Sequence, residues 1–368
     1  MTGLAGKIVR RLAAEARELR RWEALRRADG IRVYYGMDRL PVRNEQVSGG
    51  IVKCMDLAER FPDAASKANL LYLVSSALPD RRELLARAAQ RAGGRFVLNQ
   101  NGVAYPAWAG AAWREMNAPN ARVHAMADFV VYQSEFCRRC AELFLGTCKG
   151  LGEVLYNPVD TAAFSPRQNF DCNTRAPMLL VAGSHHDAYR VLSTIEALAI
   201  IRRRGVEARL AVAGRLVWSV DAEAEARRCA SDAGVADAVE FSGAYSQAEA
   251  PVLFRKADLL AHLKVQDPCP RLVVEAMACG VPVVYSATGG TTELVGDEAG
   301  HGISGVEDFE AMHLPAAEAV AEGVLHVLAD RAAFASRARE RAVRMFSASN
   351  WVDAHARIFA SLAAGGKT

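Results

Sequence analysis

Short apolar runs alternate with amphipathic stretches along nearly the whole chain, and this alternation restricts the possible folds more than any other feature. A buried strand followed by a helix produces this pattern, and its repetition predicts parallel sheets covered by helices. A first series of runs predicts strands over Ile31–Tyr35, Leu70–Ser75, Arg95–Asn99, Phe129–Tyr132 and Glu153–Tyr156. A second series predicts strands that start at Met178, Arg209, Val239, Asp258 and Val281.

A polar stretch with several prolines separates the two series, between Asn157 and Pro177. Prolines and runs of polar residues favour loops, so we place a domain boundary there. The sequence thus predicts an α/β protein in which two Rossmann-like domains, 29–170 and 171–345, face each other across a cleft. Most runs of the second series end in or soon reach a glycine, and the carboxyl ends of parallel strands are where ligands bind.

Two terminal segments flank these domains. Residues 1–28 carry eight basic and three acidic residues, a charge of +5 against −2 for the rest of the chain. Apolar residues recur there at helical spacing, which predicts a basic amphipathic helix. One interpretation packs this helix on the body of the protein, and the other docks it on an anionic membrane face that carries a lipid-linked acceptor. Residues 346–368 contain a predicted closing helix, Asn350–Leu362.

Composition excludes several classes of protein. The chain has 45 basic and 42 acidic residues, which is not the charge of a protein that coats nucleic acid. Its hydrophobic content of 51% does not fit intrinsic disorder. The longest uncharged apolar stretch, near Leu70–Leu78, is shorter than the roughly 20 residues that span a bilayer. Because Met1–Arg11 also lacks an apolar signal-peptide core, we expect a cytoplasmic protein.

Cysteine spacing predicts no metal site. Cys137 and Cys140 form a CxxC, but no second cysteine pair and no histidine pair with zinc spacing accompanies them. We interpret both as part of a helix over Ser134–Leu145. Cys279 is predicted to be a small buried apolar residue.

The residues around Asp267 carry the strongest chemical signal. Pro270 suits the first position of a helix, where its missing N–H costs nothing. The amides of Arg271 and Leu272 would then lie at a helix N-terminus, where they can bind a phosphate. Glu275, one turn further on, is placed to accept from two adjacent hydroxyls, and Asp267 would reach the same region. In the alternative, Asp267 only caps the helix and Glu275 is solvated.

Asp267 and Glu275 also begin a longer pattern. A glycine-proline strand and a Gly-Gly-x-x-Glu motif, Gly289 to Glu293, follow them. The whole region resembles the donor-nucleotide site of retaining glycosyltransferases of family 4, which have the GT-B fold. That family has two glutamates separated by seven residues, and here the first is the shorter Asp267. The resemblance implies two Rossmann-like domains, a sugar nucleotide held mainly by the second, and a closing helix that crosses back to the first.

Other segments are similar to the same family in the same order. Gly49 and Gly50 resemble a glycine-rich loop that approaches the donor diphosphate. Gly183 ends the strand that opens the second domain, and Tyr245 lies in a loop whose backbone reads the base. The resemblance implies that these residues bind the donor.

Two departures from the family concern the diphosphate. The family has an arginine just after the strand that ends at Gly183 and a lysine seven residues after that glycine. Here these positions hold Ser184 and Arg190. Arg190 keeps a positive charge and can bind phosphate with two N–H groups. Three side chains are candidates for the missing cation: His185, His186 and Arg271.

A third departure is Asn101, which stands where many members of the family have a histidine near the transferred sugar. Asparagine cannot titrate, so the donor phosphate would have to accept any proton that moves there. Asn101 followed by glycine is also an ordinary turn. In all, the resemblance covers roughly two-thirds of the chain, and residues 1–30 and Asp56–Leu70 lie outside it.

The resemblance implies a retaining glycosyltransferase of the hexosyltransferase type. Such an enzyme moves a sugar from a nucleoside-diphosphate (NDP) sugar to a hydroxyl of an acceptor glycan or lipid-linked sugar, in polysaccharide or glycolipid assembly. Arg190, the helix N-terminus and the amides of Gly49 and Gly50 would stabilise the departing diphosphate. Asp267 would hold hydroxyls of the sugar, and Glu275 the ribose. No cofactor is implied, and the sequence has no Asp-x-Asp to hold a metal.

Two other functions fit the same residues. A GT-B-like NDP-sugar epimerase would share the donor site without a second substrate. A catalytically inactive binding subunit is the other alternative, and the residues at Ser184 and Asn101 favour it. A nicotinamide dehydrogenase fits less well, because no GxGxxG opens either half.

Overall fold

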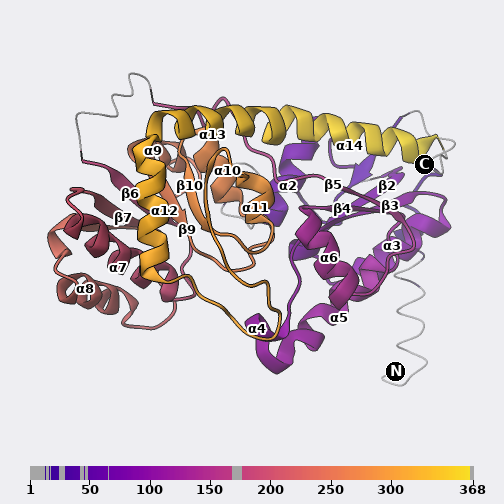
Figure 1. Ribbon diagram of the computed structural model, residues 1–368. Helices are drawn as coiled ribbons and strands as arrows, with labels where there is room; N and C mark the ends of the chain where they lie inside the picture. The colour runs from indigo at the N-terminus through magenta and orange to yellow at the C-terminus, as the bar shows by residue number, and fades with distance from the viewer. Residues whose placement is uncertain are drawn as a thin grey trace. The chain divides into compact units, whose positions relative to one another are not determined.

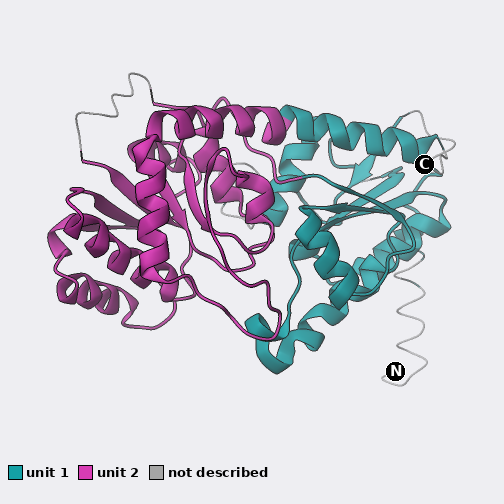
Figure 2. Cartoon of the chain, in the orientation of Figure 1, with its two compact units in different colours: residues 1–155, 349–368 teal, residues 156–348 magenta. Residues whose placement is uncertain are grey.

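The computed structural model describes residues 13, 16, 18–24, 30–41, 45, 49–64, 66–167 and 176–364 (Figure 1). The chain divides into two compact units (Figure 2). Unit 1 comprises residues 1–155 together with 349–368, and unit 2 comprises residues 156–348. The predicted boundary at 170/171 lies within 168–175, outside the described residues.

Unit 1 contains a five-stranded parallel sheet whose strands follow one another in sequence order. The strands are β1 (Val33–Tyr34), β2 (Leu70–Val74), β3 (Arg95–Gln100), β4 (Phe129–Tyr132) and β5 (Leu151–Val154). The helices are α2 (Gly49–Ala58), α3 (Arg82–Arg91), α4 (Pro106–Ala109), α5 (Trp113–His124), α6 (Glu135–Phe144) and α14 (Ala348–Ala363). Because every residue of β2 is buried, apolar side chains on both faces of the sheet form cores.

Unit 2 contains a six-stranded parallel sheet in the order β11-β10-β9-β6-β7-β8. Its strands are β6 (Met178–Ala182), β7 (Arg209–Ala213), β8 (Val239–Gly243), β9 (Leu259–His262), β10 (Val283–Ser286) and β11 (Gly300–Ile303). Its helices are α7 (Tyr189–Arg203), α8 (Ala222–Asp232), α9 (Ala250–Lys256), α10 (Arg271–Ala278), α11 (Thr291–Val295), α12 (Ala317–Ala329) and α13 (Arg331–Phe346).

The strand order of unit 2 reverses between β6 and β9. From β6 the chain adds β7 and β8 on one side, then returns to add β9, β10 and β11 on the other. The loops that leave β6 and β9 therefore diverge, and a crevice opens at the carboxyl ends of these two strands. The described strands of unit 1 show no such reversal. Topology thus places the best ligand site of unit 2 between β6 and β9.

Glycines at the carboxyl ends of β6 and β7 allow their loops to pack closely. Gly183 and Gly214 both have φ of +107°, a conformation that other residues rarely adopt. The N–H of Gly214 donates to the carbonyl of Gly243 at 2.7 Å. A Cβ atom on Gly214 would lie 1.8 Å from the carbonyl oxygen of Gly183. Backbone approach therefore explains why the apolar runs end in glycine.

Alanine at Gly214 is expected to destabilise unit 2 strongly. A positive φ alone costs about 1 kcal/mol, and the overlap with the carbonyl of Gly183 should raise the total to about 4 kcal/mol. We expect the melting temperature to fall by about 10 °C. Gly234→Ala is the matched control, because Gly234 has φ of +70° but nothing within 4 Å of the added Cβ. Equal melting temperatures for the two variants would contradict the argument.

The described part of the N-terminal segment differs from the predicted helix over 1–28. Helix ends at Leu19, and Trp22 forms a bridge with Ala68. Trp22 is buried and packs edge-on against Tyr34 at 6.0 Å between ring centroids. The chain leaves the helix because burial of this indole is worth more than another helical turn. The other residues of 1–28 lie outside the described residues, and the membrane interpretation stays a prediction.

The closing helix α14 packs in the core of unit 1. Trp351 and Phe359 are buried there beside Tyr72. His355 lies between them, donates from Nδ1 to the carbonyl of Trp351 at 2.9 Å, and accepts from the Tyr72 hydroxyl at 3.0 Å. The amide of Asn99 in turn donates to the Tyr72 hydroxyl at 3.0 Å. A buried polar chain therefore connects α14 to strands β2 and β3.

Acid is expected to weaken unit 1 through His355. Burial is the main cause that lowers the pKa of His355 to about 4, whereas the unfolded ring titrates near about 6.5. Between these values only the unfolded state binds the proton, so stability is lost as the pH falls, by about 2 kcal/mol at pH ~5. His355→Gln should melt lower than wild type at pH 7.5 but lose about 5 °C less on transfer to pH 5. Identical losses for both proteins would refute the assignment.

Candidate donor site of unit 2

The loops that follow β6 and β7 run side by side, on one side of the reversal point. The N–H of His185 donates to the carbonyl of Arg215 at 2.8 Å, and the N–H of Val217 donates back to the carbonyl of His185 at 3.0 Å. His185 is buried, and its Nε2 donates to the carbonyl of Ala213 at 3.1 Å. Burial lowers its pKa to about 4, so the ring stays neutral near pH 7. This excludes His185 as the missing cation.

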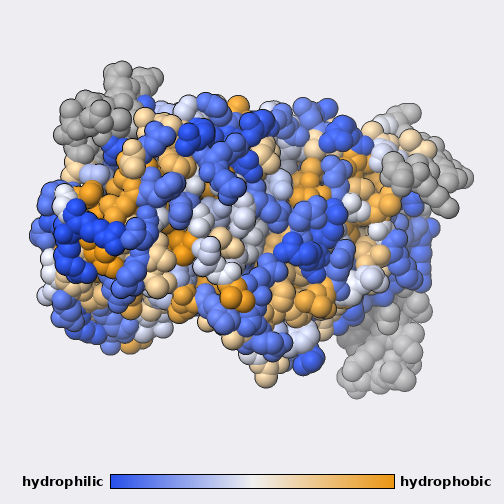
Figure 3. Space-filling model, in the orientation of Figure 1, coloured by the Kyte–Doolittle hydropathy of each residue, from blue (hydrophilic) through white to orange (hydrophobic). Residues whose placement is uncertain are grey.

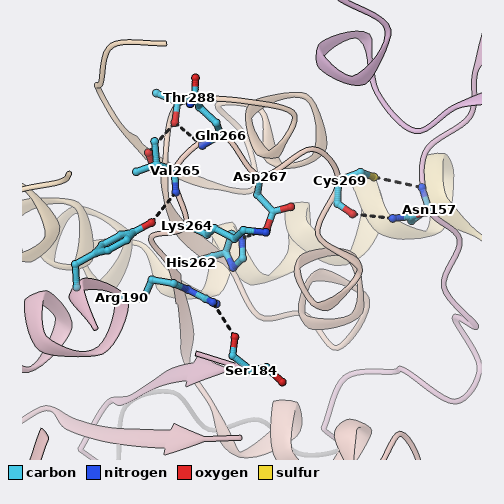
Figure 4. Close-up of polar contacts among 12 residues, drawn as sticks. Asn157, Ser184, Arg190, His262, Lys264, Val265, Gln266, Asp267, Cys269 and Thr288 are labelled. Carbon is cyan, nitrogen blue, oxygen red and sulfur yellow. Dashed lines mark hydrogen bonds and ion pairs between the residues drawn. The ribbon is translucent and has the colours of Figure 1, made fainter. Parts of the chain in front are cut away.

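Arg190 lies in the first turn of α7 and points back to the loop that follows β6. Its side chain is buried, and one guanidinium N–H donates to the carbonyl of Ser184 at 3.0 Å (Figure 4). The Nε atom is buried without a partner among the described residues. The positive charge also lowers the pKa of His262 and of His185. Arg190 therefore lies at the centre of the carboxyl edge, with hydrogen-bonding capacity to spare.

The carboxylate of Asp267 is held by two residues that the sequence analysis did not identify. His262 Nε2 and Lys264 Nζ each lie 3.2 Å from Oδ2 of Asp267 (Figure 4). Burial alone would raise the pKa of Asp267, but Lys264 and His262 outweigh it and hold that pKa well below its usual range. Burial lowers the pKa of His262, so the neutral ring donates. Asp267 is thus a fixed anion, and α10 has no side-chain cap.

The loop that carries Asp267 contains one residue with a strained backbone and packs closely against a pair of glycines. Gln266 has φ of +52°, and its N–H donates to the hydroxyl of Thr288 at 3.0 Å. Gly290 donates to the carbonyl of Asp267 at 2.9 Å. A Cβ atom on Gly289 would lie 2.7 Å from the backbone of Gln266. The Gly-Gly motif therefore lets two loops approach closely enough to fix Asp267.

Helix α10 begins at Arg271, one residue later than predicted. Pro270 is the residue before the helix, with φ of −69° and ψ of 113°. Its fixed φ still suits a helix start, and the difference is within the ordinary variation of helix ends. The amides of the first turn, including Leu272, point toward the carboxyl edge of the sheet. Leu272 also packs on Gly183, where an added Cβ would lie 3.3 Å from its Cδ2 atom.

Glu275 is buried rather than solvated. Its Oε1 accepts from the side-chain amide of Gln247 at 2.8 Å and from Nε of Arg271 at 3.0 Å. The pKa of Tyr245 is raised to about 12, mainly by burial and also by Glu275, whereas Arg190 lowers it. Glu275, Tyr245 and Arg190 all belong to unit 2.

The remaining predicted site residues belong to unit 1. Gly49 and Gly50 are the first residues of α2, and an added Cβ on Gly50 would lie 2.5 Å from the hydroxyl of Ser76. Asn101 follows β3, and its side-chain oxygen accepts from Lys53 Nζ at 3.2 Å and from Gln133. These residues form a polar group at the carboxyl ends of β2, β3 and β4.

No group of three or more side chains that could hold a metal ion is present among the described residues. Cys137, Cys140 and Cys279 are buried, as a packing role predicts. Within the described ranges no helix combines the length and apolar character needed to cross a bilayer. On the face shown in Figure 3, hydrophobic residues form separate patches among hydrophilic ones.

Comparison with known proteins finds a family match over most of unit 2. The family described as "Glycosyl transferases group 1" matches residues 166–345. A D-inositol 3-phosphate glycosyltransferase of Salinispora tropica is 37% identical over 114 residues, which cover 31% of this chain and 22% of that protein. The protein of the same name from Mycolicibacterium smegmatis is 37% identical over 78 residues, 21% of this chain and 17% of that protein. The chain thus matches about a fifth of the length of these curated relatives.

Solved structures resemble most of the chain. The structure of Anabaena Alr3699/HepE in complex with UDP has a TM-score of 0.65 at 20% identity and covers 84% of this chain and 81% of that one. Sucrose-phosphate synthase from Thermosynechococcus elongatus has a TM-score of 0.62 at 18% identity and covers 81% and 75% of the two chains. The predicted two-domain α/β fold of the GT-B class is confirmed.

Proposed function

We propose that the chain is a retaining glycosyltransferase that uses an NDP-sugar, a proposal that the match of residues 166–345 to the glycosyl transferases group 1 family supports. The observation that carries this proposal is the position of Arg190. A buried guanidinium, the first turn of α10 and a fixed carboxylate gather where the strand order of unit 2 reverses. The first two are donors for a diphosphate, and the third is an acceptor for hydroxyl groups.

The positions of the charged residues suggest where each part of the proposed donor lies along the carboxyl edge of the sheet. In the strand order, β6, which leads to α7 and Arg190, lies between β9, which leads to Asp267, and β8, which leads to Gln247, the partner of Glu275. A diphosphate at Arg190 would therefore direct the ribose toward Glu275 and the sugar toward Asp267. Both contacts to Asp267 fall on Oδ2, which leaves Oδ1 to accept from the sugar. The buried carboxylate of Glu275 would accept from the two ribose hydroxyls.

The transfer breaks the bond between the anomeric carbon and the diphosphate oxygen. The acceptor oxygen bonds to that carbon on the same face, and its proton passes to the departing diphosphate. The negative charge that grows on the leaving group is the main electrostatic demand of this step, and donors fixed in advance meet it best. Arg190 and the first-turn amides of α10 have that role, so the reaction as proposed needs no metal ion or cofactor.

In this proposal, the donor and the acceptor are chosen by analogy with the relatives and the solved neighbours. Because the Anabaena neighbour holds UDP, we propose a UDP-sugar as the first donor to test. The acceptor is a polyol, glycan or lipid-linked sugar with a free hydroxyl, in polysaccharide or glycolipid assembly. The proposed setting is the cytoplasm.

A donor panel tests the proposal against its alternatives. UDP-, GDP-, ADP- and TDP-sugars are incubated with the protein, with and without sugar or inositol phosphate acceptors and a chelator. We expect NDP release, faster with an acceptor and unchanged by the chelator, and a product that keeps the anomeric configuration of the donor by NMR. Conversion of the donor without acceptor would indicate an epimerase. Nucleotide binding without turnover of any donor would indicate an inactive binding subunit.

Glu275→Ala is expected to weaken nucleotide binding more than it slows transfer. Loss of charge-assisted bonds to the ribose should raise the Kd of the NDP by about 10- to 100-fold, with kcat at saturating donor within a few-fold of wild type. Isothermal titration calorimetry measures the first quantity and NDP release the second. Glu207→Ala, which removes an exposed carboxylate between α7 and β7, is the control. Wild-type affinity in the Glu275 variant would contradict the ribose contact.

A further inference from the structure

We propose that Lys264 supplies the second positive charge of the diphosphate site, together with Arg190. This inference rests on the proposed function and names a residue that neither the sequence nor the family match identifies. Lys264 is the second residue after β9 ends, at the strand end that faces β6 across the reversal point. Its amine lies 3.2 Å from Asp267 Oδ2, and 39% of its side chain is exposed.

The geometry places both cations around one ring. Arg190 approaches from the first turn of α7 and Lys264 from the loop after β9, and both side chains lie near the buried His262 at the end of β9 (Figure 4). His262 and Lys264 share one carboxylate oxygen of Asp267 (Figure 4). Lys264 is therefore held at the reversal point by Asp267 while part of its amine-bearing side chain stays open to a ligand. A single lysine bonded to one carboxylate oxygen keeps two further N–H donors.

The structure weakens two of the three candidates that the sequence offers for the missing cation. His185 is neutral near pH 7, and its Nε2 already donates to the carbonyl of Ala213. Arg271 bonds to Glu275 at 3.0 Å, on the side proposed for the ribose. His186 is exposed on the same loop as Ser184 and is the competing candidate for the second positive charge. Lys264 is a basic residue that bonds to Asp267 and lies at the same reversal point as Arg190.

Calorimetry with a nucleoside, its monophosphate and its diphosphate tests the assignment. The base is the one that wild type binds best in the donor panel. Lys264→Ala should raise the Kd of the diphosphate by about 10- to 100-fold, affect the monophosphate less and leave the nucleoside unchanged. Lys264→Arg should recover most of the affinity. Arg209→Ala, which removes an exposed cation at the other end of the sheet, should match wild type.

Two double variants separate a phosphate contact from an effect through Asp267. Ser184→Arg restores a cation at an exposed position of the β6 loop, so it should recover diphosphate affinity in the Lys264→Ala background. In an Asp267→Asn background, Lys264→Ala should still weaken diphosphate binding. Loss of that effect would show that Lys264 acts only by positioning Asp267 and would overturn the proposal.

Three other results would also be decisive. Equal weakening of nucleoside and diphosphate by Lys264→Ala would indicate a structural role and overturn the proposal. A diphosphate-specific loss in His186→Ala, with none in Lys264→Ala, would assign the charge to His186 instead. Wild-type protein that binds no nucleotide would contradict the proposed function itself, whereas binding that is unchanged by Lys264→Ala would contradict only this inference.

Discussion

Replacement of Arg190 by alanine is expected to lower the turnover of an NDP-sugar by about 100- to 1000-fold. The guanidinium is buried at the point where the strand order reverses, with Nε still without a partner among the described residues. It is therefore fixed before charge develops on the diphosphate, and its loss should slow the bond-breaking step more than binding. Arg190→Lys keeps the charge but loses the planar guanidinium group, so its turnover should lie between that of wild type and that of Arg190→Ala. NDP release at saturating donor measures the effect.

Arg203→Ala is the matched control for this prediction. Arg203 is the last residue of the same helix, α7, and is exposed at the other end of it. The substitution removes the same charge from the same element without touching the carboxyl edge. Its turnover and its melting temperature should equal those of wild type. Turnover of Arg190→Ala equal to that of Arg203→Ala would remove Arg190 from the mechanism.

Asp267→Asn is expected to reduce turnover by about 100-fold while NDP affinity stays within a few-fold of wild type. The carboxylate is kept ionised by Lys264 and His262, and the proposed contact is to the sugar, which NDP lacks. The variant also leaves the charge of Lys264 uncompensated, so NDP binding should not weaken. A loss of NDP affinity as large as the loss of turnover would contradict the sugar contact. Asp232→Asn, at an exposed position in α8, is the control.

The sequence predicts the strands well where burial is complete. Met178–Ala182 and Phe129–Tyr132 are apolar runs buried in their sheets, and each forms a strand over the predicted region. β11 was missed because Gly300–Ile303 contains two glycines and a histidine instead of an apolar run. β5 lies two residues earlier than predicted, since Leu151–Val154 is a partly exposed edge strand with weak patterning. The pattern reports burial, so it fails where burial is incomplete.

The site shows a similar division between local and distant interactions. Asp267, Glu275 and Arg190 were found because each lies in or near a motif with a fixed spacing. Lys264 and Gln247 were missed, although each is a polar residue soon after an apolar run. Their partners are fixed by the strand order and by the loop that Gly289 permits, neither of which has a local signature. Which polar residues at the ends of different strands come into contact is therefore visible only in the assembled sheet.

The division of unit 1 between the two ends of the chain has a consequence for its biosynthesis. Unit 2 is one continuous segment and can complete its sheet as soon as Ala348 has left the ribosome. Unit 1 must wait for Trp351 and Phe359, which are translated after all of unit 2 and fill the core of unit 1. The half that is made first is therefore finished second, and a premature stop codon just after unit 2 would harm the amino-terminal half.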